Sequence, residues 1–432
     1  MNMVLAAVVV FSLLILLFTI ILIVARIKLL PQGKVKIEIN HEKELEVDPG
    51  STLLGALSSS NIFLPSACGG GGTCAMCRCK VESGGGDVLP TELNHLSKKE
   101  VEEGVRLACQ VKVREEMEIE VPAEVFGVKK MECEVVSNLN LASFIKEFKV
   151  KLPEGEHLKF QAGDYIQIDV PQIVVDFKDI DITAHSKYHK NPQEFKTEWD
   201  KYNLWPLKMV NDEPVYRAYS MANHPAEGDI VMLNIRIATP PWDREKNTWM
   251  DVNPGICSSY IFSLKPGDKV MVSGPYGEFH INKKSKREML YIGGGAGMAP
   301  LRSQIFHMFH TEKMRDRKVT FWYGGRTRRE LFYINEFRDI EKDFDNFKFF
   351  VSLDNPLPED NWKVKENMDD PGDGFQGYIM PVVYEQYLKN HPEPEEIEYY
   401  FCGPPAMNQS VLRQLDDLGV PNEQIFFDDF GG

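Results

Sequence analysis

The stretch CGGGGTCAMCRC at residues 68–79 places four of the eight cysteines of this 432-residue chain within twelve residues. The first three follow the spacing C-x5-C-x2-C, and a single distant cysteine, Cys109, follows the third after thirty-one intervening residues. A structural zinc ion usually takes its ligands as two close pairs, whereas three thiolates on one loop and a distant fourth hold a [2Fe–2S] cluster. The spacing therefore favours a [2Fe–2S] cluster, with zinc as the alternative. The predicted ligands are Cys68, Cys74, Cys77 and Cys109.

The loop departs from the plant-type ferredoxin pattern in one respect, because its first gap holds five residues instead of four. Its glycines allow the tight turns that direct backbone N–H groups at the cluster sulfides. Cys79 follows Cys77 by two residues, where a strand is expected, and is predicted to be a small buried side chain.

Composition limits the class of protein. The length suits two to four domains, and the hydrophobic share of 43% is that of globular modules. The formal net charge of −15 argues against nucleic acid as a partner.

The N-terminus predicts a membrane anchor over residues 1–30. From Met3 to Ala25 every residue except one serine and one threonine is apolar, and a helix of this length spans about 35 Å against a hydrocarbon core of about 30 Å. A cleaved signal peptide would have a basic residue before its apolar run, and none precedes this one. Three basic residues follow it, which places the soluble part in the cytoplasm, where disulfides are rare. They are Arg26, Lys28 and Lys34.

The remaining chain divides into three predicted modules. Residues 35–126 begin with a hairpin pattern, followed by a short helix that Ser51 is expected to cap. Residues 130–283 read as short strands between Gly and Pro turns, typical of an antiparallel β-barrel, with an insertion at 172–212. Residues 284–432 alternate strands and helices, which indicates a parallel α/β nucleotide-binding layer.

Two motifs in the barrel region indicate a flavin. In the R-x-Y-S motif, Arg217 can pair with a pyrophosphate, Tyr219 can pack on an isoalloxazine, and Ser220 can hydrogen-bond its polar edge. A G-x-x-S motif at the head of a predicted helix offers N–H groups and hydroxyls to a diphosphate. The residues of this motif predicted to bind the diphosphate are Gly255, Ser258 and Ser259.

A glycine-rich loop, YIGGGAGMAP at 291–300, follows a predicted strand and opens a predicted helix, as a dinucleotide loop does. It reads G-x-G-x-x-P in place of the Rossmann pattern. The segment CGPPAM at 402–407 has the same placement after what is expected to be the last strand, where α/β sheets bind ligands. The predicted nucleotide-binding residues are Gly293, Gly295, Gly297, Pro300 and Gly403.

The order R-x-Y-S, G-x-x-S, G-x-G-x-x-P and C-G-P-P resembles the ferredoxin–NADP⁺ reductase superfamily over residues 130–432. With a ferredoxin module and an anchor in front, the whole chain resembles the F subunits of Na⁺-translocating NADH:quinone oxidoreductases, as do the insertion and the ending FFDDF at 426–430. The resemblance implies FAD, NADH and the four cysteine ligands. It also implies that Phe430 shields the flavin and that Cys402 lies near the hydride path.

The fold implied is multidomain, α+β and α/β. An N-terminal transmembrane helix would precede a β-grasp-like ferredoxin domain, an antiparallel flavin barrel and a parallel α/β domain. The implied reaction passes a hydride from NADH to FAD and then single electrons through the [2Fe–2S] cluster to membrane partner subunits and finally to quinone. The implied location is the bacterial inner membrane, with one span and cytoplasmic soluble domains.

Two other functions stay open at the level of sequence. One is a membrane-tethered NAD(P)H reductase of an oxygenase system, and the other is a zinc-stabilised adaptor with a vestigial nucleotide fold. The three arginines of YGGRTRR at 323–329 lie where the superfamily places the adenosine ribose, and arginines there favour NADPH. Glu330 can counter them, so the choice of NADH rests on the resemblance.

Overall fold

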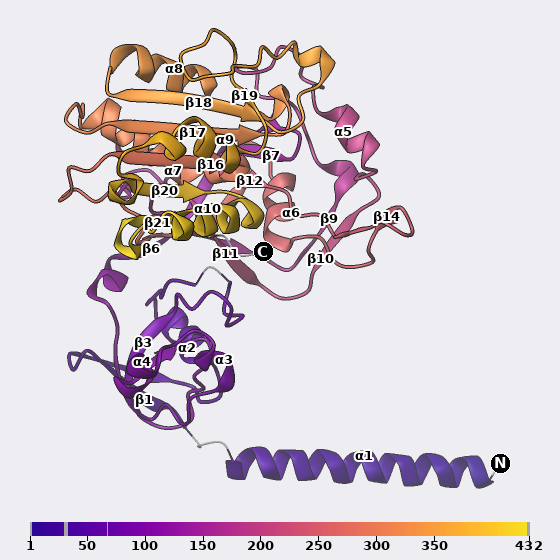
Figure 1. The fold of residues 1–432 in the computed structure, drawn as a ribbon. Coiled ribbons are helices and arrows are strands. Elements are labelled where there is room, and N and C mark those ends of the chain that lie inside the picture. The colour runs from indigo at the N-terminus through magenta and orange to yellow at the C-terminus, as the bar shows by residue number, and fades with distance from the viewer. Residues whose placement is uncertain (1, 30–32, 67, 430–432) are drawn as a thin grey trace. The chain divides into compact units, whose positions relative to one another are not determined.

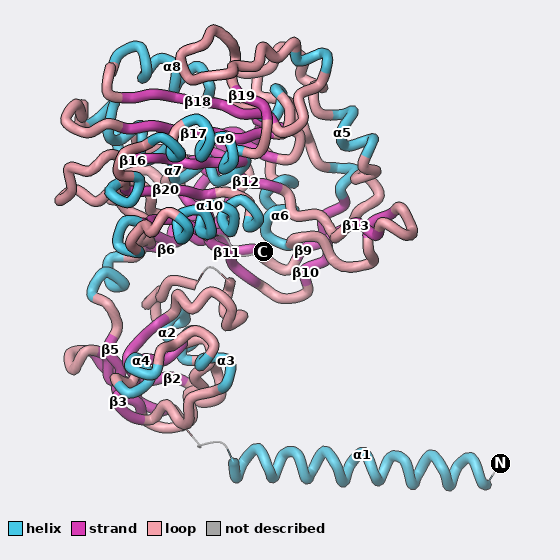
Figure 2. Tube along the Cα trace, viewed as in Figure 1, coloured by secondary structure: helices cyan, strands magenta, loops and turns pink. Residues whose placement is uncertain are grey.

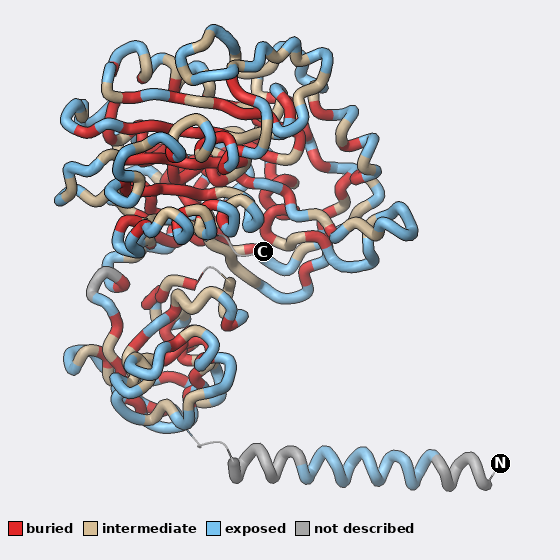
Figure 3. The backbone as a smooth tube through the Cα atoms, viewed as in Figure 1, coloured by how far each residue is buried: buried red, intermediate tan, exposed pale blue. Residues whose placement is uncertain are grey.

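The computed structural model describes residues 2–29, 33–66 and 68–429 (Figure 1). The chain divides into two compact units, residues 1–128 and residues 129–432. The first unit begins with helix α1 (Asn2–Leu29), whose described side chains, from Val8 to Ile21, are all exposed (Figure 3).

No helix within the described residues is both long and apolar enough to cross a membrane. The anchor expected over residues 1–30 therefore stays a prediction.

The cysteine-rich region folds on a five-stranded sheet with strand order β2-β1-β5-β3-β4. The predicted hairpin is confirmed as the antiparallel pair β1–β2, and β5 pairs in parallel with β1. Helix α2 packs its apolar face into the core, and its cap is Thr52, whose Oγ1 accepts from the Gly55 N–H at 3.1 Å, so the expectation of Ser51 was wrong by one residue. The elements are β1 (Val35–Ile39), β2 (Lys43–Val47), α2 (Leu53–Ser59), β3 (Arg78–Ser83), α3 (Pro90–Leu93), α4 (Lys98–Glu102), β4 (Val105–Leu107) and β5 (Met117–Glu120).

The second unit begins with the predicted antiparallel barrel, a six-stranded sheet of order β11-β8-β15-β6-β7-β12. A bridge between Met221 and Leu233 joins its two edge strands and closes it. The strands are β6 (Lys129–Ala142), β7 (Ile145–Lys151), β8 (Tyr165–Val170), β11 (Val215–Ser220), β12 (Ile230–Arg236) and β15 (Lys269–Tyr276), and helix α6 (Ile256–Ser263) follows a small hairpin of β13 (Trp242–Asp243) and β14 (Thr248–Trp249).

The insertion is ordered (Figure 2). Its ends pair as an antiparallel ribbon of β9 (Ile173–Asp176) and β10 (Lys208–Asn211), and between them lies the short helix α5 (Lys196–Lys201). Trp199 of α5 is fully buried, and its Nε1 donates to the Ser143 carbonyl at 2.8 Å. This contact fixes the insertion against the turn between β6 and β7.

The nucleotide layer is a six-stranded parallel sheet of order β19-β18-β17-β16-β20-β21, as the alternation of strands and helices predicted. Successive residues of β16 are buried on opposite faces of the sheet. Tyr291 packs in the core that contains α7 and α8. Ile292 packs in the core that contains α9 and α10. Burial on both faces is typical of such sheets (Figure 3). The elements are β16 (Met289–Gly294), α7 (Met298–Phe306), β17 (Val319–Gly325), α8 (Ile334–Asp343), β18 (Phe347–Leu353), β19 (Phe375–Gln376), α9 (Ile379–Gln386), β20 (Glu398–Cys402), α10 (Pro405–Asp417) and β21 (Ile425–Asp428).

Strand β20 was expected to be the last strand, and this was wrong. The C-terminal segment adds β21 in parallel to β20, with Asp428 opposite Cys402. Phe430 lies outside the described residues.

Candidate functional site

The four predicted cluster cysteines lie together in the first unit, and all eight cysteines of the chain are free. The Cys74 thiol donates to the Cys68 sulfur at 3.3 Å, and the thiol of Cys77 donates to Cys109. These contacts lower the pKa of Cys68 to about 3 and that of Cys109 to about 7. The same contacts raise the pKa of the donors Cys74 and Cys77. One thiol of each pair is therefore disposed to the thiolate form, which is the form that ligates a metal.

The arrangement of the sulfurs separates the two metal hypotheses. They form the two pairs just described, and within the described residues no three of them lie within 4.8 Å of one another. One tetrahedral zinc ion with Zn–S bonds of about 2.3 Å would hold all four sulfurs roughly 3.8 Å apart. Two separated pairs fit a cluster with two irons, one pair for each.

The loop backbone is built around this cradle. Gly72 has φ +77°, and a Cβ there would lie 2.6 Å from Gln110 Nε2, whose N–H donates to the Cys109 sulfur at 3.4 Å. A larger residue would displace a donor that a cluster ligand uses. Cys79 is buried in the apolar core, where burial raises its pKa to about 12, as expected for a structural side chain.

In the second unit the R-x-Y-S motif occupies β11, on the barrel edge. Arg217 is partly exposed, and its Nη1 donates to the Tyr216 carbonyl at 2.8 Å. Burial raises the pKa of the Tyr219 hydroxyl well above its usual value, and Cys257 of α6 adds to this rise. The Ser220 hydroxyl donates to the Asp428 carboxylate, which joins the barrel to the C-terminal strand.

The G-x-x-S motif begins α6, with Gly255 as the residue before its first turn. The Ser258 Oγ accepts from the Ala238 N–H at 3.1 Å, and a Cβ at Gly255 would lie 2.5 Å from the Ala238 Cβ. The Ser259 hydroxyl is buried and has no hydrogen-bond partner in the described part of the chain. Such an orphaned hydroxyl beside a helix N-terminus fits a bound phosphate oxygen.

The glycine-rich loop and CGPP meet where the strand order reverses, between β16 and β20. A Cβ on Gly297 would lie 2.0 Å from the carbonyl oxygen of Cys402, and one on Gly293 would lie 2.9 Å from Leu301 Cδ1. Pro300 is buried in the first turn of α7, and a Cβ on Gly403 would clash with Met407. The strand order and the close packing fit a dinucleotide, which binds at such a switch point.

Cys402 is fully buried, and burial raises its pKa well above the usual thiol value, with further contributions from Asp428 and Asp429. Burial likewise raises the pKa of Asp428. Because Ser220 bonds to Asp428, the register brings the flavin motif, the strand-end thiol and the C-terminal strand into one neighbourhood.

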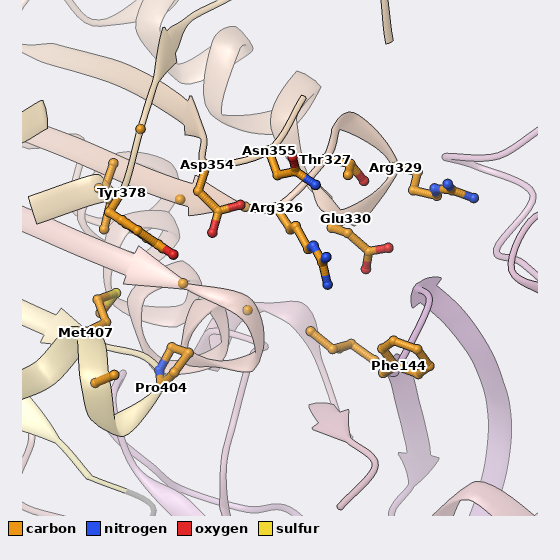
Figure 4. A pocket seen from close by; sticks show the side chains of 18 of the residues that line it. Phe144, Arg326, Thr327, Arg329, Glu330, Asp354, Asn355, Tyr378, Pro404 and Met407 are labelled. Carbon is orange, nitrogen blue, oxygen red and sulfur yellow. The ribbon is translucent and has the colours of Figure 1, made fainter. Parts of the chain in front are cut away.

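A cavity of about 670 Å³ opens beside these loops and has the size of a ligand site (Figure 4). Gly295 lines it, and so do Pro404 and Met407 of the CGPPAM segment. The rest of its wall is formed by the loop after β17 and by residues that the sequence did not point to. These are Phe144 and Ile145 at the β6–β7 turn, Glu198 and Lys201 of the insertion, Arg236 of β12, Asp354 and Asn355 after β18, and Tyr378 before α9.

The arginines of the YGGRTRR segment have different surroundings. Arg326 and Arg329 line the cavity, whereas Arg328 turns to Asp360, to whose carbonyl its Nη1 donates at 3.0 Å. Glu330 also lines the cavity, but its carboxylate accepts from both the N–H and the hydroxyl of Ser143, and burial raises its pKa. The net charge that the cavity presents to a ligand therefore cannot be read from the sequence of the YGGRTRR segment alone.

Three family models match the chain. They are the 2Fe-2S iron-sulfur cluster binding domain over residues 37–114, the oxidoreductase FAD-binding domain over 190–281 and the oxidoreductase NAD-binding domain over 291–413. Together with the fitting residues, they establish an oxidoreductase whose cofactors are a [2Fe–2S] cluster, FAD and NADH. The zinc-adaptor hypothesis is therefore wrong.

Solved structures share the fold. A cytochrome P450 reductase, GcoB, from Amycolatopsis matches with a TM-score of 0.60 at 22% identity, over 92% of this chain and 98% of that one. A ferredoxin reductase of carbazole 1,9a-dioxygenase matches with a TM-score of 0.56 at 23% identity, over 92% and 99%.

Sequence relatives are much closer. The F subunit of the Na(+)-translocating NADH-quinone reductase of Neisseria meningitidis serogroup B is 53% identical over 425 residues, 98% of each chain. The protein of that name in Mannheimia succiniciproducens is 51% identical over 424 residues, 98% of this chain and 97% of the other. The chain therefore belongs to the family of F subunits of Na⁺-translocating NADH-quinone reductases.

Proposed function

We propose that this chain is the NADH-oxidising, electron-input subunit of a sodium-translocating respiratory NADH:quinone oxidoreductase. The observation that carries the proposal is the 53% identity over 98% of the chain to relatives of that name, on a chain with cluster, flavin and nucleotide modules. The oxygenase reductases share the fold at only 22–23% identity, so the oxygenase alternative is not favoured.

The [2Fe–2S] cluster and FAD are bound by different sets of residues. Two sulfur pairs, from the loop cysteines and Cys109, ligate the cluster, and the Gln110 amide donates to one ligand sulfur. Arg217 and the orphaned hydroxyl of Ser259 hold the FAD diphosphate, while Tyr219 packs against the ring system. When bound, FAD and the cluster supply the redox chemistry that takes electrons from NADH as a pair and passes them on singly.

The nucleotide binds in the cavity, with its diphosphate over the loop that Gly295 and Gly297 shape. The close approach of Gly297 to Cys402 keeps this loop against the strand end. Cys402 lies behind this loop at the end of β20 and, being fully buried, would exclude water from that side of the bound nucleotide. Because burial raises the pKa of its thiol, Cys402 stays protonated and acts as a neutral wall of the site.

The N-terminal helix anchors the chain by a single span in the bacterial inner membrane, next to the other membrane subunits of the complex. Support comes from the apolar run Met3–Ala25 and from the basic residues after it, which keep the soluble units in the cytoplasm. Quinone is reached only through those partner subunits.

An anaerobic titration of the purified full chain with NADH tests the proposal. We expect the flavin absorbance to bleach and the electron paramagnetic resonance signal of a reduced [2Fe–2S] cluster to appear. A preparation that stays colourless after reconstitution with iron, sulfide and FAD would contradict it. Purification with several hydrophobic subunits distinguishes the sodium-translocating complex from an oxygenase system.

A further inference from the structure

The insertion contributes to the nucleotide cavity. Its helix α5 supplies Glu198 and Lys201 to the cavity wall, next to the loop after β17 that carries Arg326 and Arg329. Dinucleotide sites distinguish their two cofactors at the adenosine ribose, because an acidic side chain accepts from a free 2′-hydroxyl and arginines bind a 2′-phosphate. Both kinds of group face this cavity.

Glu198 lies among the basic groups. One carboxylate oxygen is 3.5 Å from Arg329 Nη2, and the other is 3.6 Å from Lys201 Nζ. Its side chain is only 17% exposed, so solvent screens these contacts less than on an open surface. Glu198 also acts electrostatically on Arg326, whose Nη1 donates to the hydroxyl of Tyr202, directly after α5, at 3.3 Å.

The other two carboxyl groups of the cavity are less suited to this task. Glu330 accepts two hydrogen bonds from Ser143. Asp354 interacts with Arg326, and burial raises its pKa. In Figure 4 the Arg326 side chain lies between these two carboxyl groups. Arg329 acts electrostatically on Glu330 as well, but its ion pair is with Glu198. Glu198 therefore occupies the guanidinium that a phosphate would otherwise bind.

Helix α5 holds Glu198 in place. Trp199, the next residue, is fully buried and donates to the Ser143 carbonyl, and the ring of Tyr202 packs edge-on against Phe144 at a centroid distance of 5.8 Å. The carboxylate therefore sits on a fixed support and not on a free loop.

We propose that Glu198 is a specificity-determining residue that makes the cavity select a dinucleotide with a free 2′-hydroxyl, NADH, over NADPH. It neutralises Arg329 and places a negative charge where a 2′-phosphate would lie. This inference rests on the proposed function, since it refines the nucleotide that the same cavity binds.

The test compares E198Q with the wild-type chain, both as purified full-length holoenzyme. The probes are ADP, a 5′-diphosphate with a free 2′-hydroxyl, and 2′,5′-ADP, which carries one phosphate at the 5′ and one at the 2′ position. Their dissociation constants are measured by calorimetry. We expect 2′,5′-ADP to bind at least ~10-fold more tightly to E198Q, because Arg329 is released for the phosphate, while the affinity for ADP changes little. The ratio of kcat/KM for NADPH to that for NADH should rise in parallel.

The matched control is D200N on the same helix. Asp200 pairs with Lys196 at 2.6 Å and accepts from Trp205 Nε1, and the substitution should leave both affinities unchanged. Adding R329Q to E198Q should abolish the gain. R329Q alone should weaken 2′,5′-ADP and spare ADP, which keeps the inference testable if E198Q does not fold.

Three results would overturn the inference: an unchanged ratio of the two dissociation constants in E198Q, an equal tightening of both, or a gain that survives R329Q. Failure of the proposed function looks different, because wild-type protein would then bind neither ADP nor NADH, and NADH would not bleach its flavin.

Discussion

At the scale of single residues, Cys79 and Cys109 show how one residue type takes two roles. Cys109 accepts from Gln110 and from the Cys77 thiol, whereas Cys79 packs among apolar side chains. We expect C109A to lose most of its iron and acid-labile sulfide, because one iron loses a ligand, while C79A keeps both. Chemical analysis and the visible spectrum measure this. A full cluster spectrum in C109A would show that the fourth ligand is another residue.

Glu147 of β7 gives a prediction about pH. Burial alone would raise its pKa, but hydrogen bonds and charge from His185, Lys149 and Tyr333 outweigh burial and lower it to about 2. A carboxyl pKa below the usual ~4.3 stabilises the fold above that pH, and the contribution disappears as pH falls towards 2. We expect E147Q to lower the free energy of unfolding by about 3 kcal/mol at pH 7.

The difference between E147Q and wild type should shrink as the pH is lowered through 4.5, in urea unfolding followed by circular dichroism. The control is E134Q, because Glu134 forms an exposed pair with Lys269 and such pairs contribute little. A deficit in E147Q that does not depend on pH would mean that packing, and not charge, is responsible.

At the scale of elements, the loop between β16 and α7 requires a glycine at position 297, because no side chain fits there. In G297A the new Cβ would meet the Cys402 carbonyl at 2.0 Å, and such overpacking costs about 1–3 kcal/mol. We expect the loop to shift, the dissociation constant for ADP to rise at least ~10-fold and flavin bleaching by NADH to slow. Iron and flavin contents should stay normal.

The control for this loop is G127A, since a Cβ on Gly127 meets no atom within 4 Å. If G297A binds ADP as well as G127A does, the close approach to Cys402 is not a requirement of the nucleotide site.

The sequence predicted correctly those elements whose structure depends on residues next to one another in the chain. Alternation predicted the hairpin β1–β2, and the glycine-rich stretch predicted the turn that opens α7. The cap of α2 was placed one residue early because Ser51 and Thr52 carry equivalent hydroxyls. Sequence cannot separate two adjacent residues with the same capping chemistry.

The missed features depend on contacts between distant segments. Strand β21 is short and does not alternate, and its pairing with β20 spans the whole of α10. The cavity wall includes Glu198 and Phe144, which are far in sequence from the glycine-rich loop and reach the cavity only after the insertion folds onto the β6–β7 turn. No motif marks such residues.

At the scale of the whole molecule, each unit has its own core. One buried cluster contains only residues from 35 to 125, and three others contain only residues from 131 to 420. Units with separate cores fold on their own, so we expect each unit to keep its cofactor when the other is damaged. A substitution in the flavin motif should therefore leave the iron site intact, just as C109A should leave the flavin in place.

Y219A tests this independence, because Tyr219 lies in β11 with its hydroxyl against Cys257 of α6. Loss of the ring removes a stacking surface worth about 0.5–1.5 kcal/mol, so we expect flavin affinity to fall up to ~10-fold and NADH-dependent bleaching to fall with flavin content. Iron per chain should equal that of wild type. Y219F, which keeps the ring, should retain its flavin. Parallel loss of iron and flavin in Y219A would mean that the two units fold as one, since only a shared core carries damage from the barrel to a cluster held by cysteines of the other unit.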